Sequence, residues 1–209
     1  MILKLKANSW AALLFLGVLL SQMSVNAQET IVAIRHGEKA VGGLGQISCK
    51  GLNRALALPS LLLTRFGRPD AIYAPDPAAR VDDGGNRLYS YVRPIATIEP
   101  TAIALGMPVN TQIGFNDVAT LQSELTAPSN AHALIFVAWE HLKLNDFAKQ
   151  MLESYGNHSR IVPDWPMDDY DRIYIFRITS KGGKAELTFA VEHENLNGSL
   201  SDQCPHPAK

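Results

Sequence analysis

The amino-acid sequence predicts an α/β fold, a three-layer sandwich in which a mostly parallel central sheet is flanked by helices. Short apolar runs alternate along the chain with longer segments that have the periodicity of helices. The runs at residues 31–34 and 133–138 are apolar throughout, which is typical of strands that helices cover on both faces. No internal repeat or low-complexity tract interrupts this order, and we expect residues 28–209 to form a single domain.

Residues 1–27 have the features of a secretory signal peptide. Lys4 and Lys6 supply a positive start, and an uncharged apolar stretch follows at residues 10–20. Residues 25–27, Val-Asn-Ala, then form a small-x-small cleavage pattern. The apolar stretch is shorter than the roughly 20 residues that span a bilayer, which argues against an uncleaved anchor. We therefore expect cleavage after residue 27 and an exported protein, periplasmic or extracellular, with no stable membrane span.

The first strand, residues 31–34, is followed by a glycine-containing loop and then by a helix. Ser48 is expected to cap that helix, and Gly67 to end it. Leucines, among them Leu56, should form its apolar face. Pro59 should kink or interrupt it.

The middle of the chain predicts two more strands and two more helices. Residues 70–74 form a short strand that runs into a polar loop, residues 75–86. Pro94 would open the next helix, and Pro100 would bend it. The apolar residues 133–138 predict a central strand, and residues 144–155 predict a helix.

The C-terminal part predicts an antiparallel hairpin and an irregular tail. Residues 172–179 and 184–191 flank a Lys-Gly-Gly-Lys turn, which favours a hairpin at the edge of the sheet or on its face. The tail after Glu194 is polar. An exported protein can keep a disulfide, so pairing of Cys49 with Cys204 is favoured over two free thiols. That pair would tie the tail to the first helix.

Composition argues against several classes of partner. The formal net charge of −1 gives no general attraction to nucleic acid. The acidic cluster Asp168, Asp169 and Asp171 is expected to be a solvated turn, because its spacing matches no metal motif. The same spacing argument makes four histidines surface or structural residues: His132, His158, His193 and His206. Trp139 and Trp165 are expected to pack in the core.

Four side chains that suit phosphate chemistry follow the expected strands. Arg35 and His36 come directly after the first strand, His141 follows the central strand, and Arg93 begins the helix after the second strand. Ligands bind at the carboxyl ends of strands in open α/β sheets, so we expect these residues to converge. Two guanidinium groups can grip a phosphoryl group, a neutral imidazole can attack phosphorus, and a second imidazole can stabilise the transition state.

These positions resemble the histidine phosphatase superfamily, which has the phosphoglycerate mutase-like fold. An apolar strand followed by Arg-His-Gly, a capped first helix and a second arginine with threonine four residues later all have counterparts in this chain. The matching positions are residues 31–37, Ser48, Gly51, Ala55, Arg93, Thr97 and His141. The resemblance spans about residues 31–151.

The chain departs from the family pattern in two places. Trp139 and Glu140 precede His141, where a small residue is usual, and residues 75–91 form a longer segment than in typical members. The chain also lacks the long insertions that build a cap domain in the acid phosphatase and phytase branch. It therefore resembles the smaller branch.

The resemblance implies that His36 is the nucleophile. It also implies a phosphate pocket made by His36 with Arg35, Arg93 and His141, and it implies no metal or other cofactor. The proton donor is less well specified. In many members it is a glutamate in the loop after the second helix, where Asp117 is the best match, and Glu140 and Glu38 are the alternatives.

The sequence thus predicts a metal-independent phosphate monoester hydrolase that acts through a phosphohistidine on His36. Its substrate would be a small-molecule or envelope phosphate ester. Two alternatives stay open, namely a phospho-ligand-binding or regulatory module with little catalysis, and a phosphotransferase. Specificity should lie in three loops, residues 38–46, 75–91 and 110–120. The sequence specifies neither the physiological substrate nor the oligomeric state.

Overall fold

The computed structural model describes residues 28–83 and 86–205. The expected signal peptide lies outside these residues, as does His206, so cleavage after residue 27 stays a prediction. In the described part of the chain, no helix is long and apolar enough to cross a membrane.

The central sheet has five strands in the order β4-β7-β1-β8-β9. β1 (Gln28–Arg35) is parallel to β7 (Leu134–Trp139), which is parallel to β4 (Ala71–Tyr73). β8 (Arg172–Lys181) pairs antiparallel with β1, and β9 (Lys184–His193) with β8. The predicted α/β fold with a parallel core is confirmed, and the predicted hairpin lies at the edge of the sheet.

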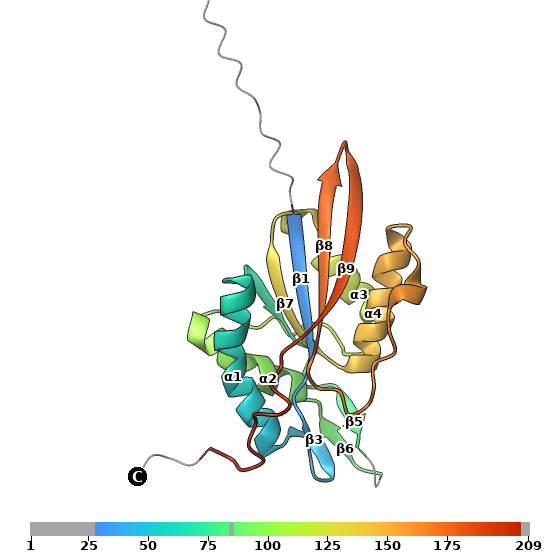
Figure 1. Cartoon of the computed structure of the whole chain (residues 1–209). Coiled ribbons are helices and arrows are strands. Elements are labelled where there is room, and N and C mark those ends of the chain that lie inside the picture. Colours follow the sequence, from blue (N-terminus) through green and yellow to red (C-terminus); the bar gives the residue numbers. More distant parts are fainter. Residues whose placement is uncertain (1–27, 84–85, 206–209) are drawn as a thin grey trace, which may run out of the picture.

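Helices cover both faces of the sheet, so the layers are helix, sheet and helix (Figure 1). One face is covered by α1 (Cys49–Phe66) and α2 (Arg93–Leu105). The other is covered by α3 (Val118–Leu125) and α4 (His141–Ser154). The structure also has two 3₁₀ turns, η1 (Pro128–Asn130) and η2 (Ser159–Ile161).

β1 is buried on both faces, as its uninterrupted apolar run predicted. Ile31 and Ala33 belong to the hydrophobic core beneath α3 and α4, whereas Val32 and Ile34 belong to the core beneath α1 and α2. Successive strand residues point to opposite faces, which places alternate side chains in the two cores. The buried β1 therefore delivers the residues at its carboxyl end to the middle of the molecule.

α1 begins and ends where the sequence predicts. The Ser48 hydroxyl accepts a hydrogen bond from the Gly51 amide, and Gly67 ends the helix with a positive φ of 90°. α1 continues through Pro59, so the predicted interruption was wrong, and a kink there stays a prediction. Leu56 was wrongly placed on the apolar face, since it is 52% exposed.

Two small hairpins lie at the carboxyl end of β1 (Figure 1). One consists of β2 (Lys39–Ala40) and β3 (Gly43–Ile47), and the other of β5 (Arg80–Asp82) and β6 (Leu88–Ser90). The second hairpin replaces part of the polar loop that the sequence predicted. The Val92 amide donates to the Gly45 carbonyl and so ties the first hairpin to the start of α2.

The C-terminal tail returns to α1. A disulfide joins Cys49 to Cys204, the pairing that the sequence allowed. Beside it, the Asn53 amide donates to the carbonyls of Ser201 and Gln203. The disulfide and these hydrogen bonds hold the tail along the first turns of α1. The tail itself contains no helix or strand among the described residues, as expected.

Candidate active site

The four predicted phosphate-binding residues lie at the carboxyl end of one strand and at the amino ends of two helices. Arg35 ends β1 and His36 follows it, while Arg93 and His141 are the first residues of α2 and α4. Their exposed fractions are 0%, 0%, 3% and 1% in that order. The His36 amide donates to the Trp139 carbonyl (3.0 Å), which joins the ends of β1 and β7. Burial of this many charged groups requires compensating partners or a ligand.

α4 starts three residues earlier than the sequence predicted. The Glu140 carboxylate accepts a hydrogen bond from the Lys143 amide (2.9 Å) and caps the helix, so His141 becomes its first residue. The other oxygen, Oε1, lies 2.5 Å from His141 Nδ1. Burial opposes ionisation of Glu140, but His141 and the amides of Lys143 and Leu142 outweigh it and lower its pKa to about 2.

Small residues allow the end of β1 to approach α1. A Cβ on Gly37 would lie 3.0 Å from the Gly51 Cα, and a Cβ on Gly51 would lie 2.7 Å from the Glu38 carbonyl oxygen. The Gly37 amide donates to Thr97 Oγ1 (2.8 Å), which donates to the Arg93 carbonyl (2.8 Å). The glycines and Thr97 therefore hold the His36 loop against both α1 and α2.

His36 is held as a neutral imidazole with one free nitrogen. Nδ1 lies 2.7 Å from the Gly37 carbonyl oxygen, which can only accept, so Nδ1 carries the proton. Burial lowers the pKa of His36 to about 3; Gly37 opposes this shift, and Arg93 and Arg35 add to it. Nε2 therefore keeps its lone pair at neutral pH and can act as a nucleophile.

Six buried polar atoms of the site have no hydrogen-bond partner of good geometry among the described residues. They are Arg35 Nε and Nη2, His36 Nε2, Tyr91 Oη, Arg93 Nε and His141 Nδ1, the last of which still lies 2.5 Å from Glu140 Oε1. An unpaired buried donor or acceptor costs about 1–3 kcal/mol, and a charged group more. Elsewhere in residues 28–83 and 86–205, such atoms occur on Glu29, Thr101 and Glu194. The concentration of unused donors around the His36 ring points to an anionic ligand.

Asp83, in the segment after β5, occupies part of this site. Arg93 donates from Nη1 (2.5 Å) and Nη2 (2.9 Å) to its two carboxylate oxygens, and the Gly45 amide donates to Oδ2 (2.7 Å). Burial opposes ionisation of Asp83, but Arg93 and Gly45 outweigh it and lower its pKa. Sequence reasoning missed Asp83, because its position depends on the conformation of the β5–β6 hairpin.

The segment before β8 also contacts the site. The Arg35 guanidinium lies 3.8 Å from the centre of the Tyr170 ring and donates from Nη1 to the Asp169 carbonyl (2.8 Å). Met167 Sδ lies 3.1 Å from His141 Nε2. Sequence reasoning missed Tyr170 and Met167 as site residues. Trp139 and Trp165 are buried packing residues, as predicted.

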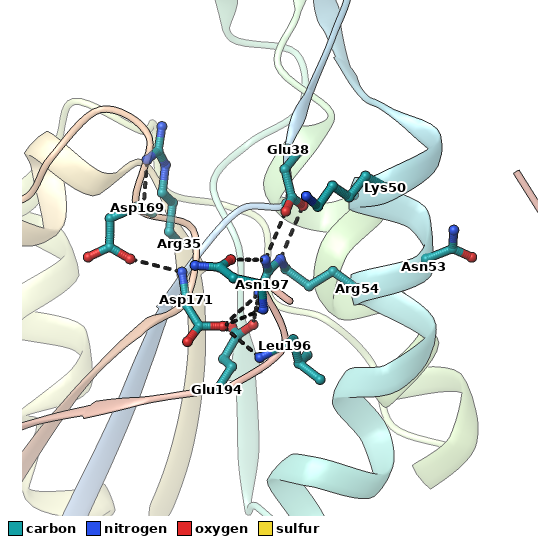
Figure 2. Close-up of polar contacts among 12 residues, drawn as sticks. Arg35, Glu38, Lys50, Asn53, Arg54, Asp169, Asp171, Glu194, Leu196 and Asn197 are labelled. Carbon is teal, nitrogen blue, oxygen red and sulfur yellow. Dashed lines mark hydrogen bonds and ion pairs between the residues drawn. The ribbon is translucent and has the colours of Figure 1, made fainter. Parts of the chain in front are cut away.

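The expected solvated acidic turn was wrong for Asp171, which is 7% exposed. It belongs to a cluster around Arg54, whose guanidinium also contacts Glu38, Glu194 and Asn197 (Figure 2). Burial raises the pKa of Glu194 to about 8. The cluster fixes Glu38, two residues after His36, to α1 and to the C-terminal tail.

The three candidate proton donors lie in different environments. Glu38 makes a two-point ion pair with Arg54 (2.8 and 3.1 Å), and Glu140 caps α4. Asp117 is exposed and caps α3 by accepting from the Thr120 amide (3.1 Å). No hydrogen bond or ion pair joins Asp117 to the four phosphate-binding residues in the part of the chain that the structure describes.

The loop that contains Asp117 nevertheless borders the site. The Phe115 ring packs edge-on against the Tyr91 ring at 4.9 Å, and its carbonyl accepts from Trp139 Nε1 (2.9 Å). Tyr91 in turn lies against His36, with ring centres 6.0 Å apart. Asp117 as the proton donor stays a prediction, and the Phe115 and Tyr91 rings connect its loop to His36.

No protein-family model matches the chain, and a search of curated proteins found no match. Solved structures do match it. A Nakamurella multipartitia protein assigned as the phosphohistidine phosphatase SixA superimposes with a TM-score of 0.52 at 16% identity, over 79% of this chain and 96% of that one. A mycobacterial glucosyl-3-phosphoglycerate phosphatase superimposes with a TM-score of 0.54 at 12% identity, over 78% of this chain and 97% of that one.

At these identities the likeness shows the fold. The chain has the phosphoglycerate mutase-like α/β fold of these small phosphatases, which lack a cap domain. The expectation of this fold from the Arg-His-Gly strand end is confirmed.

Proposed function

We propose that the protein is a histidine phosphatase, a phosphate monoester hydrolase that acts through a phosphohistidine on His36. The observation that carries the proposal is the set of unpaired buried donors on Arg35, Arg93 and Tyr91 around the neutral His36 imidazole. Guanidinium groups match the oxygens of a phosphoryl group, and they are more weakly hydrated than an ammonium. The fold of the phosphatases described above supports the same chemistry by analogy.

In the proposed first step, Arg35 Nε and Nη2 and Arg93 Nε donate to the phosphoryl oxygens. His36 Nε2 attacks phosphorus, so that an N–P bond forms while the bond to the ester oxygen breaks. The leaving oxygen takes a proton from a carboxylic acid, and His141 stabilises the charge that develops on the phosphoryl group. Glu140 beside His141 would keep that imidazole oriented.

In the second step, a water gives its proton to the same carboxylate and attacks phosphorus, which breaks the N–P bond and releases inorganic phosphate. We propose Asp117 as this acid and base. Glu140 is held ionised by its contacts, and Glu38 is occupied by Arg54, whereas Asp117 is exposed on a loop that borders the site. Asp117→Asn should then slow poor leaving groups more than good ones.

The test is to trap the intermediate. The mature chain is mixed with a ³²P-labelled aryl phosphate without added metal and quenched in denaturant at alkaline pH, where phosphohistidine survives. Label should appear on the peptide that contains His36, and His36→Ala should lose both the label and turnover. An active wild-type enzyme without any such label would contradict the mechanism.

We further propose that the protein works outside the cytoplasm, on small-molecule or envelope phosphate esters. The disulfide is compatible with export, and the sequence of residues 1–27 supports it. The names of the structural neighbours give two starting substrates, phosphohistidine and glucosyl-3-phosphoglycerate. A panel of both with aryl phosphates would compare kcat/KM directly, and N-terminal sequencing of the exported protein should begin at Gln28.

One observation favours the alternative of a binding or regulatory module. Asp83 already accepts hydrogen bonds from both terminal nitrogens of Arg93, and the four predicted phosphate-binding residues are almost fully buried. The module would bind phosphate without saturable turnover. A phosphotransferase would instead release less inorganic phosphate when an acceptor alcohol is added, and it would form a new ester.

A further inference from the structure

Tyr91 lies two residues before Arg93, and its side chain is 1% exposed. Its hydroxyl has no hydrogen-bond partner of good geometry among the described residues. We infer that Tyr91 is a further catalytic residue, whose hydroxyl donates a hydrogen bond to the phosphoryl group bound between Arg35 and Arg93. The inference rests on the proposed phosphatase function, and it adds a donor that the Arg-His-Gly pattern does not contain.

The packing of the ring places Tyr91 beside the nucleophile. Its centre lies 6.0 Å from that of the His36 ring, with the two planes nearly perpendicular at 87°. The Arg93 guanidinium lies over the ring at 4.9 Å, and Phe115 packs against it at 4.9 Å. These three neighbours hold the ring and therefore aim the hydroxyl.

The hydroxyl lies among the charges of the site. The charged side chains that act on it are those of Glu140, Arg93 and Arg35. Burial raises the pKa of Tyr91 well above its usual range, and Glu140 adds to the shift. Arg93 and Arg35 oppose it, and the Arg93 guanidinium lies close to the hydroxyl oxygen, although without the geometry of a hydrogen bond. The phenol therefore keeps its proton at neutral pH and can donate a hydrogen bond.

Other buried tyrosines of the chain have partners. The Tyr73 hydroxyl donates to Glu124 Oε1 (3.3 Å), and the Tyr174 hydroxyl donates to Asn145 Oδ1 (2.5 Å). Buried hydroxyls are normally paired in this way. Phenylalanine at position 91 would keep the same ring contacts without leaving a hydroxyl unpaired. A tyrosine here is best explained by a ligand atom that accepts from it.

The test compares Tyr91→Phe with the wild type and with Tyr73→Phe, which removes the same atom from a buried tyrosine away from the site. Binding of inorganic phosphate and of orthovanadate is measured by calorimetry, kcat/KM is measured with an aryl phosphate, and Tm is measured without ligand. Tyr91→Phe should weaken vanadate binding and lower kcat/KM by about 10- to 100-fold. Its Tm should equal or exceed that of the wild type, because the lost hydroxyl was unpaired.

Tyr73→Phe should show the reverse pattern, with a lower Tm and unchanged anion binding. Unchanged vanadate binding and kcat/KM in Tyr91→Phe would overturn the inference, as would a lower Tm with proportionate loss of all activities. The binding measurement decides the role of Tyr91 even if the wild type does not turn over. A wild type that binds vanadate but forms no phosphohistidine would instead count against the proposed function alone.

Discussion

Asp83 and Arg93 form a two-point ion pair at the candidate site, with side chains that are only 5% and 4% exposed. The carboxylate takes both terminal nitrogens of the guanidinium and leaves Nε unpaired. A carboxylate in this position presents two anionic oxygens where a phosphoryl group would also bind. The two anions therefore compete for Arg93 or sit side by side on it.

Asp83→Asn should strengthen inhibition by inorganic phosphate by about tenfold, which corresponds to about 1.4 kcal/mol. The reason is that like charges next to each other in a binding site repel by several kcal/mol. The inhibition constant of phosphate, measured in parallel for both proteins, checks this. Asp82→Asn is the matched control, since it removes the same charge from an exposed neighbour on the same hairpin. Weaker phosphate binding in Asp83→Asn would show that Asp83 mainly keeps Arg93 in position.

The pKa of His36 predicts how the site responds to acid. Because burial lowers this pKa to about 3, we expect Nε2 to stay unprotonated down to about pH 4. Below the ordinary value of 6.5 the unfolded chain takes up a proton that the folded protein refuses, so His36 lowers stability progressively from pH 6.5 towards pH 3.

NMR of ¹³C-labelled histidine in the intact protein can follow the His36 ring, with His36→Ala to assign the signal. The midpoint should lie below pH 4 or be reached only with unfolding. A midpoint near 6.5 would mean that the imidazole is solvated, and the argument for a permanently neutral nucleophile would be lost.

Gly51→Ala should disturb the site although it lies on α1. The added Cβ would meet the Glu38 carbonyl at 2.7 Å and the Glu38 amide nitrogen at 2.9 Å, and Glu38 is two residues from His36. Overpacking of this kind typically costs 1–3 kcal/mol, so we expect about 2 kcal/mol of lost stability together with lower kcat. Urea denaturation and steady-state kinetics check both.

Gly114→Ala is the matched control, because no atom lies within 4 Å of the Cβ that it adds. It should change neither stability nor kcat by more than a small amount. If Gly51→Ala behaves in the same way, the close approach of α1 to the His36 loop does not constrain the site.

Replacement of Cys49 and Cys204 by serine should lower the free energy of unfolding. The bond joins residues 155 positions apart, and the loop-entropy model assigns about 5 kcal/mol to a loop of that length. Chemical denaturation of the double variant and of the reduced wild type should give similar losses. If reduction of the wild type leaves the denaturation midpoint unchanged, the disulfide does not contribute to the stability of the fold.

Local signals made much of the fold predictable. The unbroken apolar run of β1 predicted burial on both faces, and Ser48 and Gly67 predicted the ends of α1, because capping needs only residues that are close in sequence. The start of α4 was wrong by three residues, since the role of Glu140 as a cap depends on how its carboxylate turns back to Lys143. The exposure of Leu56 depends on what the rest of the chain packs against α1.

The site residues at the end of a strand could be predicted from the sequence, whereas those that hairpins and loops contribute could not. Arg35 and His36 follow a buried strand, so their location comes from the sheet itself. Asp83, Tyr91 and Tyr170 reach the same place through hairpin and loop conformations for which the sequence carries no periodic signal. Tyr91 offered the one available hint, a tyrosine two residues before the predicted phosphate-binding arginine.

The Arg54 cluster affects the stage of synthesis at which the protein can finish folding. Arg54 and Glu38 leave the ribosome before Glu194 and Asn197, which follow Arg54 by 140 and 143 residues. Until they arrive, the buried guanidinium lacks two of its partners and the strand end that bears His36 lacks part of its support. A nascent or C-terminally shortened chain would therefore carry every residue of the proposed phosphate pocket without the framework that sets their positions.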